Sequence, residues 1–166
     1  MVDSSTLVMN AFNSETAAVG EPRLRNGQAA PAVWPAMLAL QQVANQNQLE
    51  PRLVELVKLR ASQINRCAYC IDLHFRQAAA RGESPDRLYL LSAWEDAGRY
   101  SPRERAALRW TEALTRLAET GVPDEVFAEA SARFSEAELL QLSLVVVAIN
   151  GWNRLHAGFR IPPDAP

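Results

Sequence analysis

The chain has 166 residues, of which 48% are hydrophobic and 22% are charged, and this is the size and composition of one globular domain. Its net charge of −2 gives it no excess of positive charge with which to bind nucleic acid or an anionic membrane surface. We therefore expect neither nucleic acid nor a membrane among its partners.

The N-terminal segment lacks the features of a signal peptide. It carries Asp3 where a signal peptide has positive charge, and it has no sustained apolar run before Glu15. The longest apolar run, 144–149, is far shorter than the roughly 18 residues that span a bilayer. We expect a cytoplasmic protein, with a flexible N-terminal arm over 1–25 and one all-helical domain over 26–166.

Helix start signals divide the remaining chain into short segments. Ser101 and Ser135 are each followed by a glutamate three residues later, which is the pattern of a capping box, and Ser84 precedes a proline. No useful length of sequence alternates as a half-buried strand does, so the predicted fold class is all-α. About seven helices are predicted, over 31–47, 51–64, 67–81, 85–96, 102–119, 123–132 and 136–158.

The last predicted helix is apolar around most of its circumference from Leu139 to Ile149. Such a helix must be covered on all sides. Because one small domain rarely covers a helix completely, we expect part of it to be buried against another subunit of a homo-oligomer. The four tryptophans lie on apolar helix faces and are assigned to the core or to an interface: Trp34, Trp94, Trp110 and Trp152.

The segment RCAYCIDLH, residues 66–74, contains both cysteines and one of the two histidines. A structural disulfide, a metal site and a redox dithiol are the three alternatives. A disulfide closing so short a loop constrains the unfolded chain little, and a reducing cytoplasm keeps most thiols free. A structural zinc needs two further strong ligands, and only His74, His156 and carboxylates are available. We favour the redox dithiol and expect no metal and no cofactor.

Helical spacing places Cys67, Cys70 and His74 on one face of a helix. The imidazole of His74 then lies within one turn of the Cys70 sulfur, where it can accept the thiol proton and leave a reactive thiolate. The dipeptide Asn65-Arg66 fits a helix cap, which would place Cys67 in the first turn, where the helix dipole also favours a thiolate.

Two other titratable residues each allow two interpretations. Glu55 lies in the apolar context LVELVKL, and it is either a buried carboxylate facing the thiols or a solvated one beside Lys58. His156 forms a row with Asn153 and Ile149 on the last predicted helix. It either approaches the dithiol or serves as a packing or interface histidine, and we favour the second interpretation.

Residues 55–74 combine a glutamate, a CxxC pair twelve residues later and a histidine four residues after the second cysteine. This combination resembles the core of the AhpD-like alkylhydroperoxidases of the carboxymuconolactone decarboxylase family, and the resemblance extends over about residues 30–162. It implies an AhpD-like helical fold in which the CxxC begins a central helix that packs against the glutamate-bearing helix. It also implies assembly into trimers or hexamers and dithiol-dependent reduction of hydroperoxides.

The resemblance assigns a role to each residue of the motif. Cys70 would be oxidised by the hydroperoxide to a sulfenic acid, Cys67 would resolve it to a disulfide, and Glu55 and His74 would relay the proton. The helix dipole favours Cys67 as the more acidic thiol, but we follow the resemblance because His74 neighbours Cys70. The partners implied are a small hydroperoxide and an external dithiol reductant, which the sequence does not identify.

Tyr69 departs from the pattern, because AhpD itself carries a second histidine between the cysteines. The lactone decarboxylases of the same family generally lack the CxxC, so its presence argues against decarboxylation. The alternative function is a redox-sensing or partner-binding protein that uses the same dithiol without turning over peroxide.

Overall fold

The computed structural model describes residues 21–23 and 30–163, and within these ranges it contains helices and no strand. The predicted all-α fold class is thereby confirmed. The helices are α2 (Val33–Asn45), α3 (Pro51–Ile64), α4 (Ala68–Ala80), α5 (Pro85–Leu90), α6 (Trp94–Ala97), α7 (Pro102–Thr115), α8 (Leu117–Thr120), α9 (Asp124–Ser131) and α10 (Glu136–Gly158), with a 3₁₀ turn at Leu91–Ala93.

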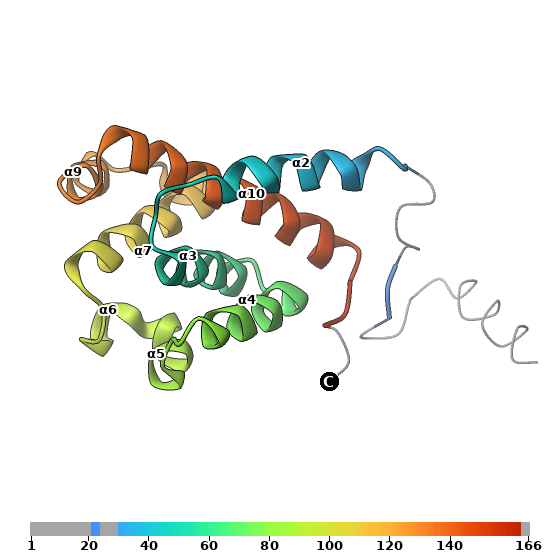
Figure 1. The fold of residues 1–166 in the computed structure, drawn as a ribbon, viewed down its shortest axis with the longest axis horizontal. Coiled ribbons are helices and arrows are strands. Elements are labelled where there is room, and N and C mark those ends of the chain that lie inside the picture. The colour runs from blue at the N-terminus through green and yellow to red at the C-terminus, as the bar shows by residue number, and fades with distance from the viewer. Residues whose placement is uncertain (1–20, 24–29, 164–166) are drawn as a thin grey trace, which may run out of the picture.

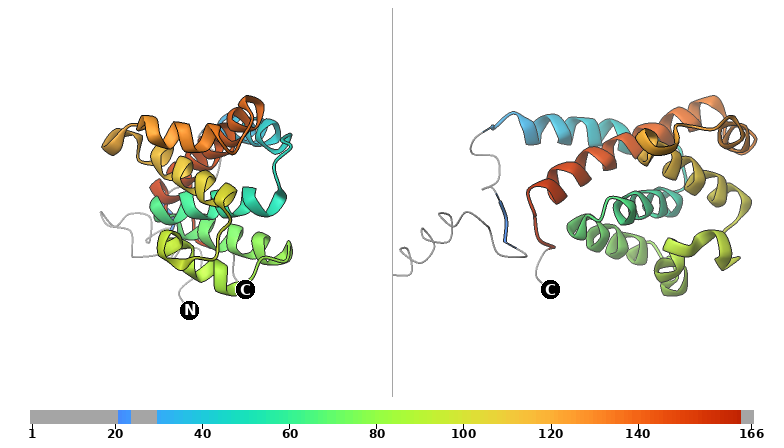
Figure 2. Two further views of the ribbon diagram at one scale, coloured as in Figure 1. Left: turned by 90° about the vertical axis from the view of Figure 1, so that its left-hand side faces the viewer. Right: turned by 180° about the vertical axis from the view of Figure 1, so that it is seen from behind.

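Helix α3 lies at the centre of the domain and packs against α4, α7 and α10 (Figure 1). Helices α2 and α10 run side by side above it, and α4 lies on its other side, as two further views show (Figure 2). All ten residues from Leu53 to Ser62 are buried. Because α3 has no solvent-facing side along this stretch, its polar side chains must find their partners inside the fold.

The two predicted capping boxes are both formed. The hydroxyls of Ser101 and Ser135 accept hydrogen bonds from the backbone N–H groups of Glu104 and Glu138, and each glutamate side chain bonds back to the serine N–H. These boxes fix the starts of α7 and α10. The start of α10 matters for function, because the C-terminal end of this helix reaches the candidate site.

Two predicted helices are interrupted in the structure. The segment 85–96 contains α5, a 3₁₀ turn and α6, and the backbone at Ala93 leaves helical geometry. This irregular path accompanies the burial of Trp94, which is 1% exposed and donates its indole N–H to Glu112 Oε1 at 2.7 Å. The segment 102–119 is broken at Arg116, where α7 ends and α8 begins.

Helix α10 is less enclosed than α3. Leu140 and Val147 are 67% and 55% exposed in the single chain, so burial of this face against another subunit stays a prediction. No helix in the described ranges is long and apolar enough to cross a membrane. The predicted arm over 1–25 lies outside the described residues, apart from 21–23.

Candidate functional site

The two cysteines lie at the turn between α3 and α4. Arg66 has a left-handed backbone with φ of 55°, which redirects the chain at the end of α3. Cys67 is itself the N-cap of α4, and its Sγ accepts the N–H of Cys70 at 3.4 Å. The sequence predicted that Asn65-Arg66 would cap this helix and that Cys67 would lie in its first turn. This prediction is wrong by one residue, because Cys67 is itself the cap and the first turn begins at Ala68.

Cys67 and Cys70 are joined by a disulfide. The two residues are 1% and 2% exposed, and they pack in a small apolar cluster with Ala61 and Ile149. The structure therefore represents the oxidised state of the CxxC pair, held at the N-terminus of α4.

A buried amide network ties this turn to α10. The side-chain N–H₂ of Asn65 donates to Oδ1 of Asn150 and of Asn153, at 2.9 Å each. Asn153, which is 1% exposed, donates in turn to Ser62 Oγ at 3.0 Å. Asn153 lies one helical turn before His156, so these bonds fix the rotation of α10 that brings His156 to the disulfide.

His156 makes the contact that the sequence motif assigned to His74. Its Nδ1 lies 3.4 Å from Cys70 Sγ, and its ring meets Tyr69 edge-on at 4.5 Å between centroids. The rings of Trp34 and Trp152 stack on the His156 ring, with centroid distances of 5.9 and 5.3 Å. The favoured interpretation of a purely packing histidine is therefore incomplete, since His156 both packs and approaches the dithiol.

Burial favours the neutral form of His156. Desolvation lowers the pKa of its imidazole below the ordinary value of 6.5. The neutral ring, which has a free nitrogen lone pair, is therefore the dominant form at neutral pH.

Glu55 and His74 form a separate pair beside the dithiol. Of the two interpretations of Glu55, the structure supports the buried one, because the residue is 2% exposed and its Oε2 accepts from His74 Nδ1 at 2.8 Å. Lys58 Nζ and an Arg81 guanidinium nitrogen lie 3.6 and 3.7 Å from Oε1. Burial raises the pKa of Glu55, but the His74 bond and these two cations outweigh it, so the net pKa is below 4.5. Among the described residues, no hydrogen bond joins His74 to either sulfur, which corrects the expected contact with Cys70.

Replacing Glu55 with glutamine should lower the free energy of unfolding by about 3 kcal/mol at neutral pH, because Lys58 would keep a buried charge without its counterion. The folded carboxyl has a depressed pKa, so its contribution is complete above the ordinary value of 4.5 and is lost as the pH falls through the folded value. Urea unfolding at neutral pH and at about pH 3.5 measures this dependence. Glu95→Gln, which breaks the exposed pair with Arg109, is the matched control and should change the free energy by less than about 1 kcal/mol. An equal loss of unfolding free energy in Glu55→Gln and Glu95→Gln would contradict the assignment of Glu55 as the buried counterion of Lys58.

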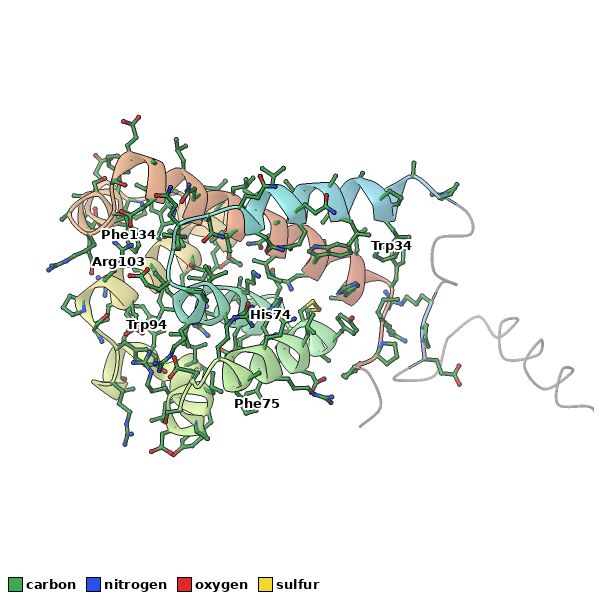
Figure 3. All side chains as sticks on the ribbon, viewed as in Figure 1. Trp34, His74, Phe75, Trp94, Arg103 and Phe134 are labelled. Atoms are coloured by element: carbon green, nitrogen blue, oxygen red, sulfur yellow. A yellow bond between two sulfur atoms is a disulfide. The ribbon has the colours of Figure 1, made fainter. Side chains whose placement is uncertain are left out.

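The disulfide opens onto a cavity of about 910 Å³ whose lining includes Cys70, His74 and His156 but not Cys67. Figure 3 shows the disulfide as a yellow bond, with His74 and Trp34 labelled on either side of it. Trp34 and Trp152 also line this cavity, so they belong to the site rather than to the core alone. Trp94 and Trp110 are buried, as their helical pattern predicted.

A metal ion was one alternative for the cysteines. The ligand atoms of Cys67, Cys70 and His156 all lie within 4.8 Å of one another. This set is one ligand short of a structural zinc site, and in the disulfide the sulfurs are bonded to each other rather than available as thiolates. We assign no metal to it.

Comparison with known proteins places the chain among relatives. A model of the carboxymuconolactone decarboxylase family matches residues 28–113. The protein YdfG of Bacillus subtilis is 36% identical over 126 residues, which cover 76% of this chain and 86% of that one.

Solved structures show the same relationship. A protein of unknown function from Agrobacterium tumefaciens, described as a candidate AhpD antioxidant defence protein, is 38% identical with a TM-score of 0.85, covering 88% of this chain and all of that one. A peroxidase-related protein from Silicibacter, 20% identical with a TM-score of 0.71 over 79% of this chain and 70% of that one, shares the fold. The chain belongs to the carboxymuconolactone decarboxylase family and has the helical fold of its AhpD-like members.

Proposed function

We propose that the protein is a dithiol-dependent hydroperoxide reductase in which Cys70 attacks the peroxide and Cys67 resolves the product. The observation that carries this proposal is the 3.4 Å contact between Cys70 Sγ and His156 Nδ1, made on the wall of a substrate-sized cavity. The Agrobacterium tumefaciens relative, which is 38% identical and is described as a candidate AhpD antioxidant defence protein, is consistent with this proposal.

In the first step, the reduced Cys70 thiol gives its proton to His156, and the thiolate attacks the terminal oxygen of the hydroperoxide. The O–O bond breaks, Cys70 becomes a sulfenic acid, and the alkoxide takes the proton back from His156 to leave as an alcohol. The sulfur loses two electrons and the peroxide gains them. His156 thus serves as base and then as acid within one step.

In the second step, the Cys67 sulfur attacks the Cys70 sulfenic acid, and the disulfide forms as water leaves. The Cys67 proton ends on this departing oxygen, and we assign its transfer to His74, which lines the cavity and is hydrogen-bonded to Glu55. An external dithiol then reduces the disulfide by thiol–disulfide exchange and is itself oxidised.

The choice of Cys70 as the attacking thiol is supported by access and by its neighbour. Cys70 lines the cavity and its Sγ lies 3.4 Å from His156 Nδ1, whereas Cys67 is not among the residues that line the cavity wall and has no hydrogen bond to His156 among the described residues. Cys67 Sγ accepts the backbone N–H of Cys70, which stabilises a thiolate there and suits Cys67 as the thiol that is displaced when the disulfide is reduced.

The alternative is a redox sensor or partner-binding protein whose dithiol oxidises once. Hydroperoxide consumption in excess dithiothreitol separates the two functions, and the double variant Cys67→Ala, Cys70→Ala measures the background. A reductase should consume many equivalents of cumene hydroperoxide per protein chain. Consumption that stops after one equivalent, although dithiothreitol remains, would favour the sensor. Decarboxylation, which the family also includes, is disfavoured by the CxxC pair.

A further inference from the structure

Lys58 is a buried cation whose ammonium donates no hydrogen bond to the described part of the chain. Its residue is 7% exposed, and its side chain lines the cavity beside Cys70. Within the described ranges, its ammonium forms one ion pair, with Glu55 Oε1 at 3.6 Å, which is longer than a normal hydrogen bond, and it donates no hydrogen bond. An ammonium carries three N–H donors, and buried charges are normally hydrogen-bonded. The unfilled donors lie where a ligand would bind.

The charges around the cavity do not cancel. One carboxylate, Glu55, is approached by two permanent cations, Lys58 and Arg81, and by the N–H of His74. Among the described residues that line the cavity there is one lysine, Lys58, and no arginine, aspartate or glutamate. A net positive charge in a partly desolvated cavity attracts an anionic group.

A large part of the cavity wall is apolar, beside the amides of Gln41, Asn45 and Gln77. Trp34, Leu38, Ile149 and Trp152 contribute to its wall. Its volume of about 910 Å³ is in the range of cavities that hold whole organic molecules and is far larger than hydrogen peroxide requires. One cavity therefore combines the Cys70 sulfur, apolar side chains and the Lys58 ammonium.

We infer that Lys58 forms a subsite for a carboxylate, so that the preferred substrate is an amphipathic hydroperoxide that carries a carboxylate on an apolar chain. This inference rests on the proposed reductase activity for the identity of the reacting group. The binding of the carboxylate itself does not depend on turnover, so the two can be tested separately.

The competing explanation is that Lys58 serves only to neutralise Glu55. Binding to the oxidised protein, which cannot react, distinguishes the two, with dodecanoate and its methyl ester as probes and the fluorescence of the cavity tryptophans as the signal. Wild type should bind dodecanoate at least about tenfold more tightly than the ester, as expected for a hydrogen bond to a charged group. Lys58→Met should remove this preference without weakening the ester, and Lys58→Arg should retain much of it.

Arg52→Met is the matched control, because Arg52 also lies on α3 and pairs with a carboxylate, Glu83, but does not line the cavity. It should leave both affinities unchanged. Equal affinity of wild type for the two probes, or an equal loss of both in Lys58→Met, would overturn the inference. In a second experiment, kcat/KM is measured for a fatty-acid hydroperoxide and for its methyl ester, and the wild type should prefer the free acid. Preferential dodecanoate binding without consumption of either hydroperoxide would refute the reductase and leave the carboxylate subsite standing.

Discussion

Replacing Cys70 with serine should reduce the rate of hydroperoxide reduction by about 10⁴-fold or more, to the level of a protein without either cysteine. Cys70 is the sulfur that lines the cavity and lies 3.4 Å from His156, so we expect Cys67, which is not among the lining residues, not to replace it as nucleophile. Replacing Cys67 with serine should leave the first oxidation nearly unchanged, because Cys67 acts only after the O–O bond has broken.

The asymmetry between the two cysteines is measured in a single turnover. Prereduced protein is mixed with cumene hydroperoxide in a stopped-flow instrument, and the product is trapped with dimedone for mass spectrometry. Cys67→Ser should accumulate a sulfenic acid on Cys70, because its resolving thiol is absent. A dimedone adduct on Cys67 in the Cys70→Ser variant, formed at the wild-type rate, would reverse the assignment.

Replacing His156 with glutamine should slow the oxidation of Cys70 by about 10²–10⁴-fold, which is the usual contribution of a positioned general base. His74→Gln is the informative comparison, because His74 is hydrogen-bonded to Glu55 and not to the sulfur. It should instead slow the second step, the formation of the disulfide. Rapid-quench mass spectrometry resolves the sulfenic acid from the disulfide and so reports the two steps independently.

The pH dependence of the first step gives a second readout of His156. Because burial lowers its pKa below 6.5, His156 stays neutral, and able to accept a proton, below the pH at which an exposed histidine would become charged. The wild-type rate constant should therefore persist as the pH falls through 6.5 and decline only at lower pH, and His156→Gln should lose this decline. An unchanged oxidation rate in His156→Gln would show that the 3.4 Å contact is only packing.

The parts of the molecule that local sequence determines were predictable. Ser101 and Ser135 form capping boxes because the glutamate three residues later is part of the same first turn. The link between Glu55 and His74 follows from the packing of α3 against α4, which the family resemblance implied. The buried state of Glu55 was left open by its spacing alone and depends on the coverage of α3 from every side.

The contact between His156 and Cys70 was beyond such prediction, because 86 residues separate them. Helical periodicity places His156 on the same face as Asn153, but it does not show which helix that face meets. The amide network from Asn65 decides this, and each of its bonds is long-range in sequence. Tyr69 occupies the position at which AhpD has a second histidine. In this chain α10 brings the imidazole of His156 against the Tyr69 ring.

The most direct measurement of the central claim is the second-order rate constant for prereduced wild-type protein with cumene hydroperoxide, set beside that of free dithiothreitol at the same pH. A Cys70 thiol activated by His156 in a cavity should react at least about 100-fold faster than the free thiol, and the disulfide should be the product. A rate constant no greater than that of dithiothreitol would contradict the claim, because the dithiol would then be oxidisable without being catalytic.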